Sequence, residues 1–154
     1  MPDEFAVETL EFVAVRERLA RHTSFSAGRE LALALLPTPD LAEAQRRQAA
    51  TAEALKLPGL RPALHLGGVH DMRPLAARAE VGGSLAPDEL LDVASTVKAA
   101  RAWRRGLGPL ADETPTLLEL AEAFLSDHPG LAEDIQEAIS ESGEVLDAPE
   151  LNRT

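Results

Sequence analysis

The sequence has no cysteine among its 154 residues, and aromatic residues make up only 3% of it. The first absence excludes disulfide bonds, thiolate catalysis and cysteine-ligated zinc. The second means that a core must be built from Leu, Ala and Val, since hydrophobic residues still amount to 45% of the chain. Ala and Leu are strong helix formers, whereas strands prefer β-branched and aromatic residues, so the composition favours helices.

Long apolar runs are also absent. No stretch of about 18 apolar residues occurs, so no membrane-spanning helix is predicted. The acidic start Met1-Pro2-Asp3-Glu4-Phe5 lacks the basic residues that open a secretory signal. We therefore expect a cytoplasmic protein that does not contact a membrane.

Bases are nearly missing from the last third of the chain. The net charge is −11, yet residues 1–110 carry 14 acids and 14 bases. Residues 111–154 carry 12 acids and a single base, Arg153. Such a segment repels phosphate and is not expected to hold nucleic acid by itself. A solvated face of helices explains this charge, and a docking surface for a basic partner is the alternative.

Apolar residues recur with the 3.6-residue period of amphipathic helices along most of the chain. With capping residues and proline or glycine boundaries, this pattern predicts seven helices. Their expected positions are Thr9 to His22; Ser24 or Ser26 to Leu36; Thr38 to Leu57, with Thr38 as the cap; Asp71 to Glu80; Pro87 to Leu107; one starting at Thr114-Pro115; and one starting at Asp127 or His128 before Pro129. Pro58-Gly59 is expected to stop the third helix, and Gly82-Gly83 to turn the chain before the fifth.

Six of the seven predicted helices have residues expected to face the core. On the first helix, Leu10, Val13, Glu17 and Ala20 form one row and Phe12, Val15 and Leu19 form the next. The rows on the others are Ala27, Leu31, Ala34 and Leu35; Leu41, Ala44, Gln48, Thr51 and Leu55; Leu90, Ala94 and Val97; Leu117, Leu118, Ala121 and Phe124; and Leu131, Ile135, Ala138 and Ile139. Glu144 to Asp147 predicts a short extended segment, and Pro149 the start of a further helix. Because that pattern breaks off at Thr154, we expect a fragment of a longer protein. Short connections between such helices favour an all-α antiparallel bundle, and we expect a single domain over residues 1–154.

No catalytic or nucleotide-binding signature occurs. The loop G-x-x-x-x-G-K-[ST], the glycine motif G-x-G-x-x-G and the nucleophile motif G-x-S-x-G are all missing. His65 and His70 have only Asp71 nearby, and a metal shell needs three or four ligands. Neighbouring acids such as Glu133 and Asp134 are better explained as an exposed helical face than as an acid–base pair. We therefore predict no catalytic residue, no metal and no cofactor in this chain.

A basic cluster lies at the end of the predicted fifth helix. It consists of Lys98, Arg101, Arg104 and Arg105, of which Lys98, Arg101 and Arg105 share one helical face. These four residues are the candidates for contacting nucleic-acid phosphates. The alternative is that they are favourable charges at the negative end of the helix dipole, with arginine stems covering apolar neighbours. Trp103, beside them, is predicted to be a core residue or a partner-facing anchor.

Five stretches of this sequence, taken in order, carry a resemblance to a known family. They are Leu10-Glu11-Phe12 with Gly28-Arg29-Glu30-Leu31-Ala32; Leu36-Pro37 and Asp40 with Gln48, Thr51, Glu53 and Ala54; Leu66-Gly67-Gly68-Val69 with Asp71; Ala79-Glu80-Val81-Gly82-Gly83 with Leu85, Pro87 and Glu89-Leu90-Leu91; and Ile139 with Gly143-Glu144-Val145-Leu146-Asp147 and Pro149-Glu150-Leu151. In this order and spacing the chain resembles the N-terminal helical region of the MutS-related family called endonuclease MutS type 2. One departure is Ala86 before Pro87, where a Ser or Thr cap is expected.

The resemblance implies a function that periodicity and composition do not. Proteins of this family resemble MutS without its mismatch-recognition domain, and they join a helical core and lever region to an ATPase domain and an Smr nuclease domain. They are associated with recombination suppression, branched DNA and rescue of stalled ribosomes. On this resemblance the chain is a non-catalytic core segment, and ATP and magnesium belong to the parent protein.

The implied partners are the missing domains, a second copy in a homodimer, and DNA or the ribosome through the full-length protein. The alternative function is a protein–protein interaction or dimerisation module. Such a module would dock through its helical surface and its acidic last third.

Overall fold

The computed structural model describes residues 11–64, 67–123 and 130–146, and within these ranges it is all-α. Its elements are α2 (Phe12–Ala20), α3 (Ser26–Ala34), α4 (Leu41–Leu60), α5 (Arg73–Glu80), α6 (Pro87–Leu107), the 3-10 helix η1 (Gly108–Leu110), α7 (Pro115–Glu122) and α8 (Leu131–Ala138). The described part contains no strand, although an isolated antiparallel bridge joins Ile139 to Val145. The predicted all-α class with seven helices is confirmed.

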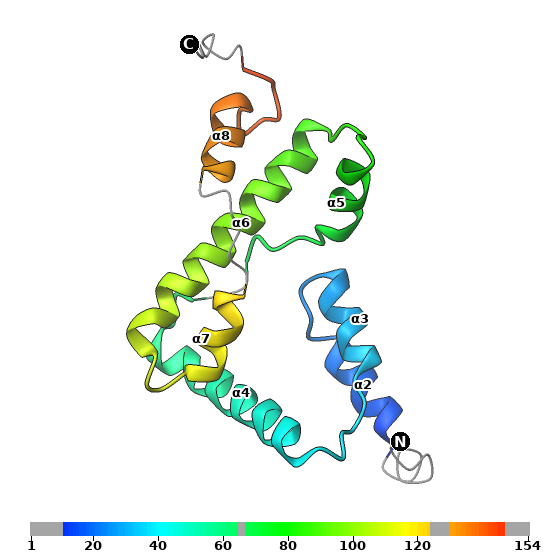
Figure 1. The fold of residues 1–154 in the computed structure, drawn as a ribbon, viewed down its shortest axis with the longest axis vertical. Helices are drawn as coiled ribbons and strands as arrows, with labels where there is room; N and C mark the ends of the chain where they lie inside the picture. Colours follow the sequence, from blue (N-terminus) through cyan, green and yellow to red (C-terminus); the bar gives the residue numbers. More distant parts are fainter. Residues whose placement is uncertain (1–10, 65–66, 124–129, 147–154) are drawn as a thin grey trace.

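Helix α6 is the long axis around which most of the structure is arranged (Figure 1). Helix α8 packs beside its N-terminal half, and α7 and η1 pack near its C-terminal end. Helix α4 joins this group through its contact with α7, while α2 and α3 form a hairpin to one side. The acidic helices α7 and α8 therefore both rest on α6.

Two apolar clusters hold these helices together. The first joins α6 to α8 through Ala94, Ala132, Ile135 and Ile139. The second joins α4, α6 and α7 through Leu57, Leu107 and Ala121, with Trp103 packed against it. These clusters confirm the predicted inward rows of α6, α7 and α8, apart from Phe124, which lies outside the described residues. Trp103 is half-buried and packs against the second cluster.

The boundaries of α6 agree with the prediction from Pro87 to Leu107. Ala86 has no side-chain oxygen to cap this helix, but the carboxylate of Glu89 accepts the backbone N–H of Ala86 at 2.8 Å. Glu89 also pairs with Arg78 at the end of α5. Half of a capping box is therefore present, and it compensates for the missing Ser or Thr.

The ends of α4 differ from the prediction. Asp40, not Thr38, is the cap, because its carboxylate accepts the N–H groups of Ala42 at 2.8 Å and Glu43 at 3.2 Å. The Thr38 hydroxyl instead accepts the N–H of Asp40 at 3.2 Å. Pro58 does not stop the helix, which runs to Leu60. A proline in the last turn removes a single helical hydrogen bond, which the final turn tolerates.

The predicted inward face of α4 is wrong. Leu41 and Leu55 of that row are 71% and 78% exposed, while Glu53 and Leu57 are the buried residues of this helix. Helix α7 packs against the face that carries Glu53 and Leu57. Burial of a carboxylate requires hydrogen-bond donors from elsewhere in the chain, and those donors cannot be read from local periodicity.

The C-terminal part is described as far as residue 146. The predicted start of the seventh helix at Asp127 or His128 lies outside the described residues, and α8 is described from Leu131. The predicted extended segment is present as far as residue 146. The backbone N–H of Ser140 donates to the carbonyl of Glu144 at 2.9 Å, and the backbone N–H of Leu146 donates to the carbonyl of Ala138 at 2.8 Å. The helix predicted from Pro149 lies outside the described residues.

Candidate functional site

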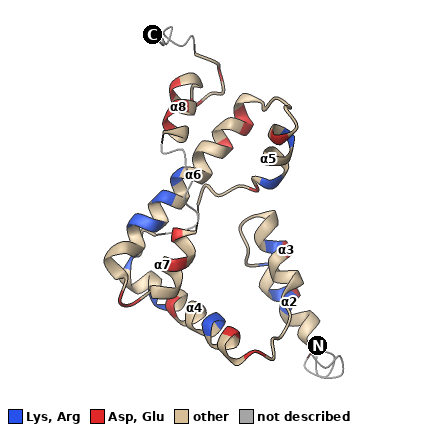
Figure 2. Ribbon diagram, in the orientation of Figure 1, with Lys and Arg blue, Asp and Glu red and all other residues tan. Residues whose placement is uncertain are grey.

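The predicted basic cluster lies on the C-terminal half of α6, and we call it the basic end of α6 (Lys98, Arg101, Arg104 and Arg105). The N-terminal half of the same helix carries Asp88, Glu89 and Asp92. Figure 2 shows this division as red bands toward the α5 end of α6 and blue bands toward the α7 end. Lys and Arg at the end of a helix also complement the negative pole of its dipole.

Two of the four candidate residues are engaged with α8. Arg101 donates through Nη1 to both carboxylate oxygens of Glu133, at 2.8 and 2.9 Å. The Lys98 ammonium contacts the Gln136 side-chain oxygen. The hydrogen bond from Arg101 lowers the pKa of Glu133 below its ordinary value. Lys98 and Arg101 therefore add polar contacts to the packing of α8 on α6, next to the apolar contact of Ala94 with Ala132 and Ile135.

The other two candidates are exposed to solvent. Arg104 and Arg105 follow the point where α8 leaves the surface of α6. Of the ion pairs found between described residues, none involves either guanidinium. These side chains are thus available for an anionic partner, whereas Lys98 and Arg101 are shared with α8.

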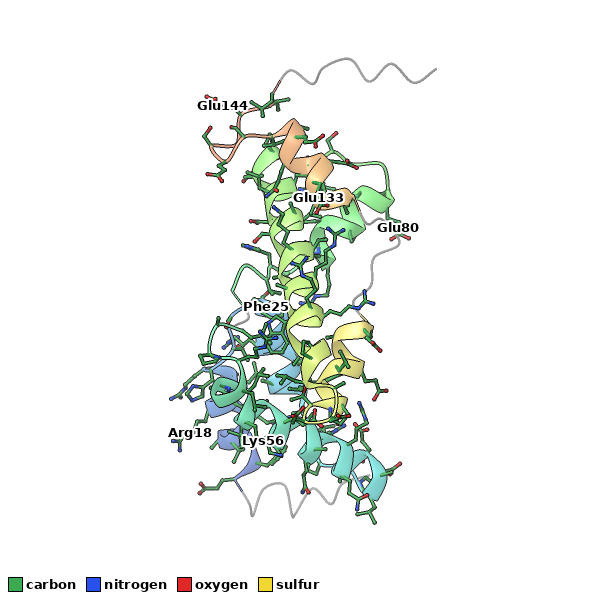
Figure 3. The ribbon with its side chains drawn as sticks, turned by 90° about the vertical axis from the view of Figure 1, so that its left-hand side faces the viewer. Arg18, Phe25, Lys56, Glu80, Glu133 and Glu144 are labelled. Carbon is green, nitrogen blue, oxygen red and sulfur yellow. The ribbon has the colours of Figure 1, made fainter. Side chains whose placement is uncertain are left out.

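Packing brings further basic residues to this end of α6. The second apolar cluster places Leu57 of α4 with Leu107 of α6. A Cβ on Gly106 would lie 2.8 Å from Cδ1 of Leu64, so the turn after α4 rests directly on α6. Exposed Arg61, which caps α4, and exposed Lys56 (Figure 3) accompany these contacts. Sequence reasoning missed both residues, because Arg61 and Lys56 lie 43 and 48 positions before Arg104 and no local pattern signals the contact.

A buried carboxylate connects α4 to α7 beside this end. Glu53 is only 7% exposed, and its two oxygens accept the backbone N–H groups of Thr116 at 3.2 Å and Leu117 at 2.8 Å. These donors lie in the first turn of α7, whose own cap residue, Thr114, makes no side-chain capping bond. Burial alone would raise the pKa of Glu53, but the hydrogen bonds from Leu117 and Thr116 hold it below its ordinary value.

The histidines and the neighbouring acids are the residues that were considered for metal binding and acid–base chemistry. None of their His, Asp and Glu side chains form a group of three or more that could hold a metal ion. Nδ1 of His70 lies 3.5 Å from the Asp92 carboxylate, and His65 lies outside the described residues. Glu133 and Asp134 are exposed, and Glu133 is engaged by Arg101.

Among the helices of ranges 11–64, 67–123 and 130–146, none has the length and apolar character needed to cross a membrane.

The chain was compared with family models and with individual known proteins. No family model matches the chain. Individual proteins that match it are named endonuclease MutS2. The endonuclease MutS2 of Symbiobacterium thermophilum is 41% identical over 145 residues, which cover 94% of this chain and 18% of that protein. Those of Geobacillus kaustophilus and Geobacillus thermodenitrificans are 41% and 42% identical over 144 and 140 residues, again covering 18% of each relative. The chain thus spans about a fifth of the length of these relatives.

Proposed function

Because the chain is homologous to a segment of the proteins named endonuclease MutS2, we propose that it is a helical core segment of a DNA-processing ATPase of that kind. The identity extends over more than nine-tenths of the chain, and this single observation carries the proposal. Residues 1–154 then form one helical domain of a cytoplasmic protein. The parent's work is recombination suppression, processing of branched DNA or rescue of stalled ribosomes.

The packing of the described residues supports a non-catalytic role. Their buried side chains join helices, as Leu107 and Ala94 do, and their one buried carboxylate, Glu53, is occupied by the N-terminus of α7. A segment of this kind holds other parts of a protein in position. ATP with magnesium, and the nuclease centre, would then bind in the remaining four-fifths of the parent.

We further propose that the nucleic-acid-facing part of the segment is the basic end of α6. Arg104 and Arg105 are exposed there, and Arg61 and Lys56 add two more cations. The N-terminal half of α6, with Asp88, Glu89 and Asp92, and the acidic helix α8 that packs beside it would be repelled by phosphate. The separation of charge along α6 would therefore orient the segment, with its basic end toward nucleic acid.

Purified proteins test the scaffold proposal directly. This chain and the full-length endonuclease MutS2 of Geobacillus kaustophilus are assayed side by side for ATP hydrolysis and for cleavage of branched DNA. We expect turnover by the full-length relative and none by the 154-residue chain. Turnover by this chain, abolished by substituting one of its own carboxylates, would mean that a reactive site had been overlooked.

A second candidate is a protein-interaction or dimerisation module. Its support is the number of large apolar side chains that the described surface exposes, among them Leu31 at 73% and Leu55 at 78%. Contiguous exposed apolar surface is typical of interaction sites. Light scattering after size exclusion distinguishes this candidate, which predicts a dimer that Leu31→Ser or Leu55→Ser converts to a monomer.

A further inference from the structure

The α2–α3 hairpin and α5 are attached to the rest of the structure differently from the other described helices, because neither contributes to the two apolar clusters. Among the described helices, α2 and α3 pack extensively only against each other. Neither of the two apolar clusters contains a residue of the hairpin. Its own buried side chains are Ala20 and Ala32, both small. Apolar burial therefore holds the hairpin together but does not fix its position against α4, α6 and α7.

Hydrogen bonds and an ion pair between described residues join the hairpin to the start of α5. The Ser26 hydroxyl donates to Asp71 Oδ2 at 2.7 Å, and the Arg73 guanidinium donates to Glu30 Oε2 at 2.8 Å. Arg73 also binds the Asp71 carboxylate, at 2.6 Å and 2.8 Å. We call these four residues, Ser26, Glu30, Asp71 and Arg73, the latch. It ties the start of α3 to the start of α5.

The ion pair of the latch that reaches the hairpin is exposed to water. The side chains of Arg73 and Glu30 are 57% and 62% exposed, whereas that of Asp71 is 17% exposed. Ion pairs at this exposure contribute little free energy, and salt screens them. The latch can therefore set the position of the hairpin at low ionic strength without locking it there.

Two neighbouring residues of the linker between the hairpin and α4 are hydrogen-bonded to different helices. The Leu35 carbonyl accepts a long hydrogen bond, 3.5 Å, from Arg16 of α2. The next carbonyl, that of Leu36, accepts one from Arg47 of α4 at 2.9 Å. Pro37 and Pro39 stiffen the stretch that leads into α4. A change of direction is thus confined to the junction between Leu35 and Leu36.

We propose that the α2–α3 hairpin is a movable arm that pivots at the Leu35–Leu36 junction and is held in its docked position by the Ser26–Asp71–Arg73–Glu30 latch. Movement of the arm carries with it the exposed Leu31 and the half-exposed Val13, Val15 and Leu19. It therefore changes which apolar surface the segment presents. The position of the arm is set by charge, so ionic strength and an anionic or cationic ligand near Asp71 shift it.

The cysteine-free chain allows a direct distance measurement. Arg18→Cys on α2 and Ala102→Cys on α6, both exposed, are spin-labelled, and the distribution of distances between the labels is recorded. The Ser26→Ala/Glu30→Ala variant removes the latch from the α3 side only, so the hydrogen bonds between Asp71 and Arg73 remain. Arg29→Ala, an exposed substitution on the same helix, is the matched control.

We expect one narrow distance for the unsubstituted arm at low salt. The latch variant, or about 1 M salt, should raise the fraction of molecules at other distances by roughly two- to five-fold, while Arg29→Ala leaves it unchanged. A second label pair, Gln45→Cys on α4 and Glu119→Cys on α7, reports whether the rest stays folded and should not change. Distributions that are the same with and without the latch, while this second pair is intact, would overturn the proposal.

Discussion

The carboxylate of Glu53 in α4 accepts the backbone N–H of Leu117 in α7 at 2.8 Å, across 64 positions of sequence. With its second oxygen on the N–H of Thr116, Glu53 caps a helix to which it does not belong. The first N–H groups of a helix have no partner within it, and the positive end of the helix dipole favours a carboxylate there. This one side chain therefore fixes the angle and position at which α7 meets α4.

Replacing Glu53 should be costly. Glu53→Ala leaves two N–H groups of α7 buried without an acceptor, and we expect a loss of about 1.5 to 3 kcal/mol in the free energy of unfolding. Glu119→Ala, an exposed carboxylate on α7, is the matched control and should change stability by less than about 0.5 kcal/mol. Urea unfolding followed by circular dichroism measures both. Equal stability of the two variants would show that Glu53 does not cap α7.

The same carboxylate should make stability fall in acid. The pKa of Glu53 in the folded chain lies below its ordinary value of 4.5, so the folded state binds its proton less readily than the unfolded state does. The stabilisation is fully present above about pH 4.5 and is lost as the pH falls through the lower folded pKa. Urea midpoints measured from about pH 7 down to about pH 3 should converge for the wild type and Glu53→Gln. Curves that stay parallel over this range would contradict the assignment.

Gly68 should tolerate no side chain. Its φ is +77°, and a Cβ there would lie 2.7 Å from the Ser95 hydroxyl oxygen. Gly82 has a similar φ of +78° but open space around it, so Gly82→Ala measures the backbone strain alone, about 1 to 2 kcal/mol. We expect Gly68→Ala to lower the melting temperature further than Gly82→Ala does. Ser95→Ala by itself removes the hydrogen bond that this hydroxyl donates to the Gly68 carbonyl at 2.9 Å, so the cost of Gly68→Ala is compared with and without Ser95→Ala. Gly68→Ala should cost less when Ser95 is Ala, and an equal cost in both backgrounds would mean that the clash is not with Ser95.

The four basic residues of α6 should separate into two classes by their effect on stability. Arg101→Ala removes the paired hydrogen bonds to Glu133 and should cost about 0.2 to 1 kcal/mol, an effect that high salt reduces. Arg104→Ala and Arg105→Ala should leave the unfolding midpoint unchanged. If all three substitutions destabilised the chain alike, the division between α8-binding and exposed residues would be wrong.

The sequence was most informative where apolar burial decided the structure. The row through Ala94 and Val97 and that through Ile135 and Ile139 predicted the contact faces of α6 and α8, and proline at the first position placed the start of α6 at Pro87. The face of α4 could not be found in this way. Its buried residue Glu53 depends on N–H groups 63 and 64 positions away, and a polar residue breaks the pattern on which the prediction rests.

In the candidate site too, the residues could be predicted from the sequence but their tertiary contacts could not. The cluster of Lys98, Arg101, Arg104 and Arg105 is visible in the sequence, but its partition is not, because Glu133 of α8 meets Arg101 only after the helices pack. Arg61 joins the cluster through the contact of Leu64 with Gly106, which has no local signature. Tertiary contacts of this kind require the folded arrangement.

The binding of labelled branched DNA to the purified chain, followed by fluorescence anisotropy from about 50 to about 200 mM salt, is the most direct test of the proposed nucleic-acid-facing end. Arg18→Ala/Arg21→Ala, which removes the same charge from exposed positions on α2 and at its C-cap, is the control for Arg104→Ala/Arg105→Ala. If the basic end of α6 contacts phosphate, the latter variant should bind more weakly than the control, with a slope of log K against log salt smaller by about 2. Equal binding and equal slopes for the two double variants would contradict it.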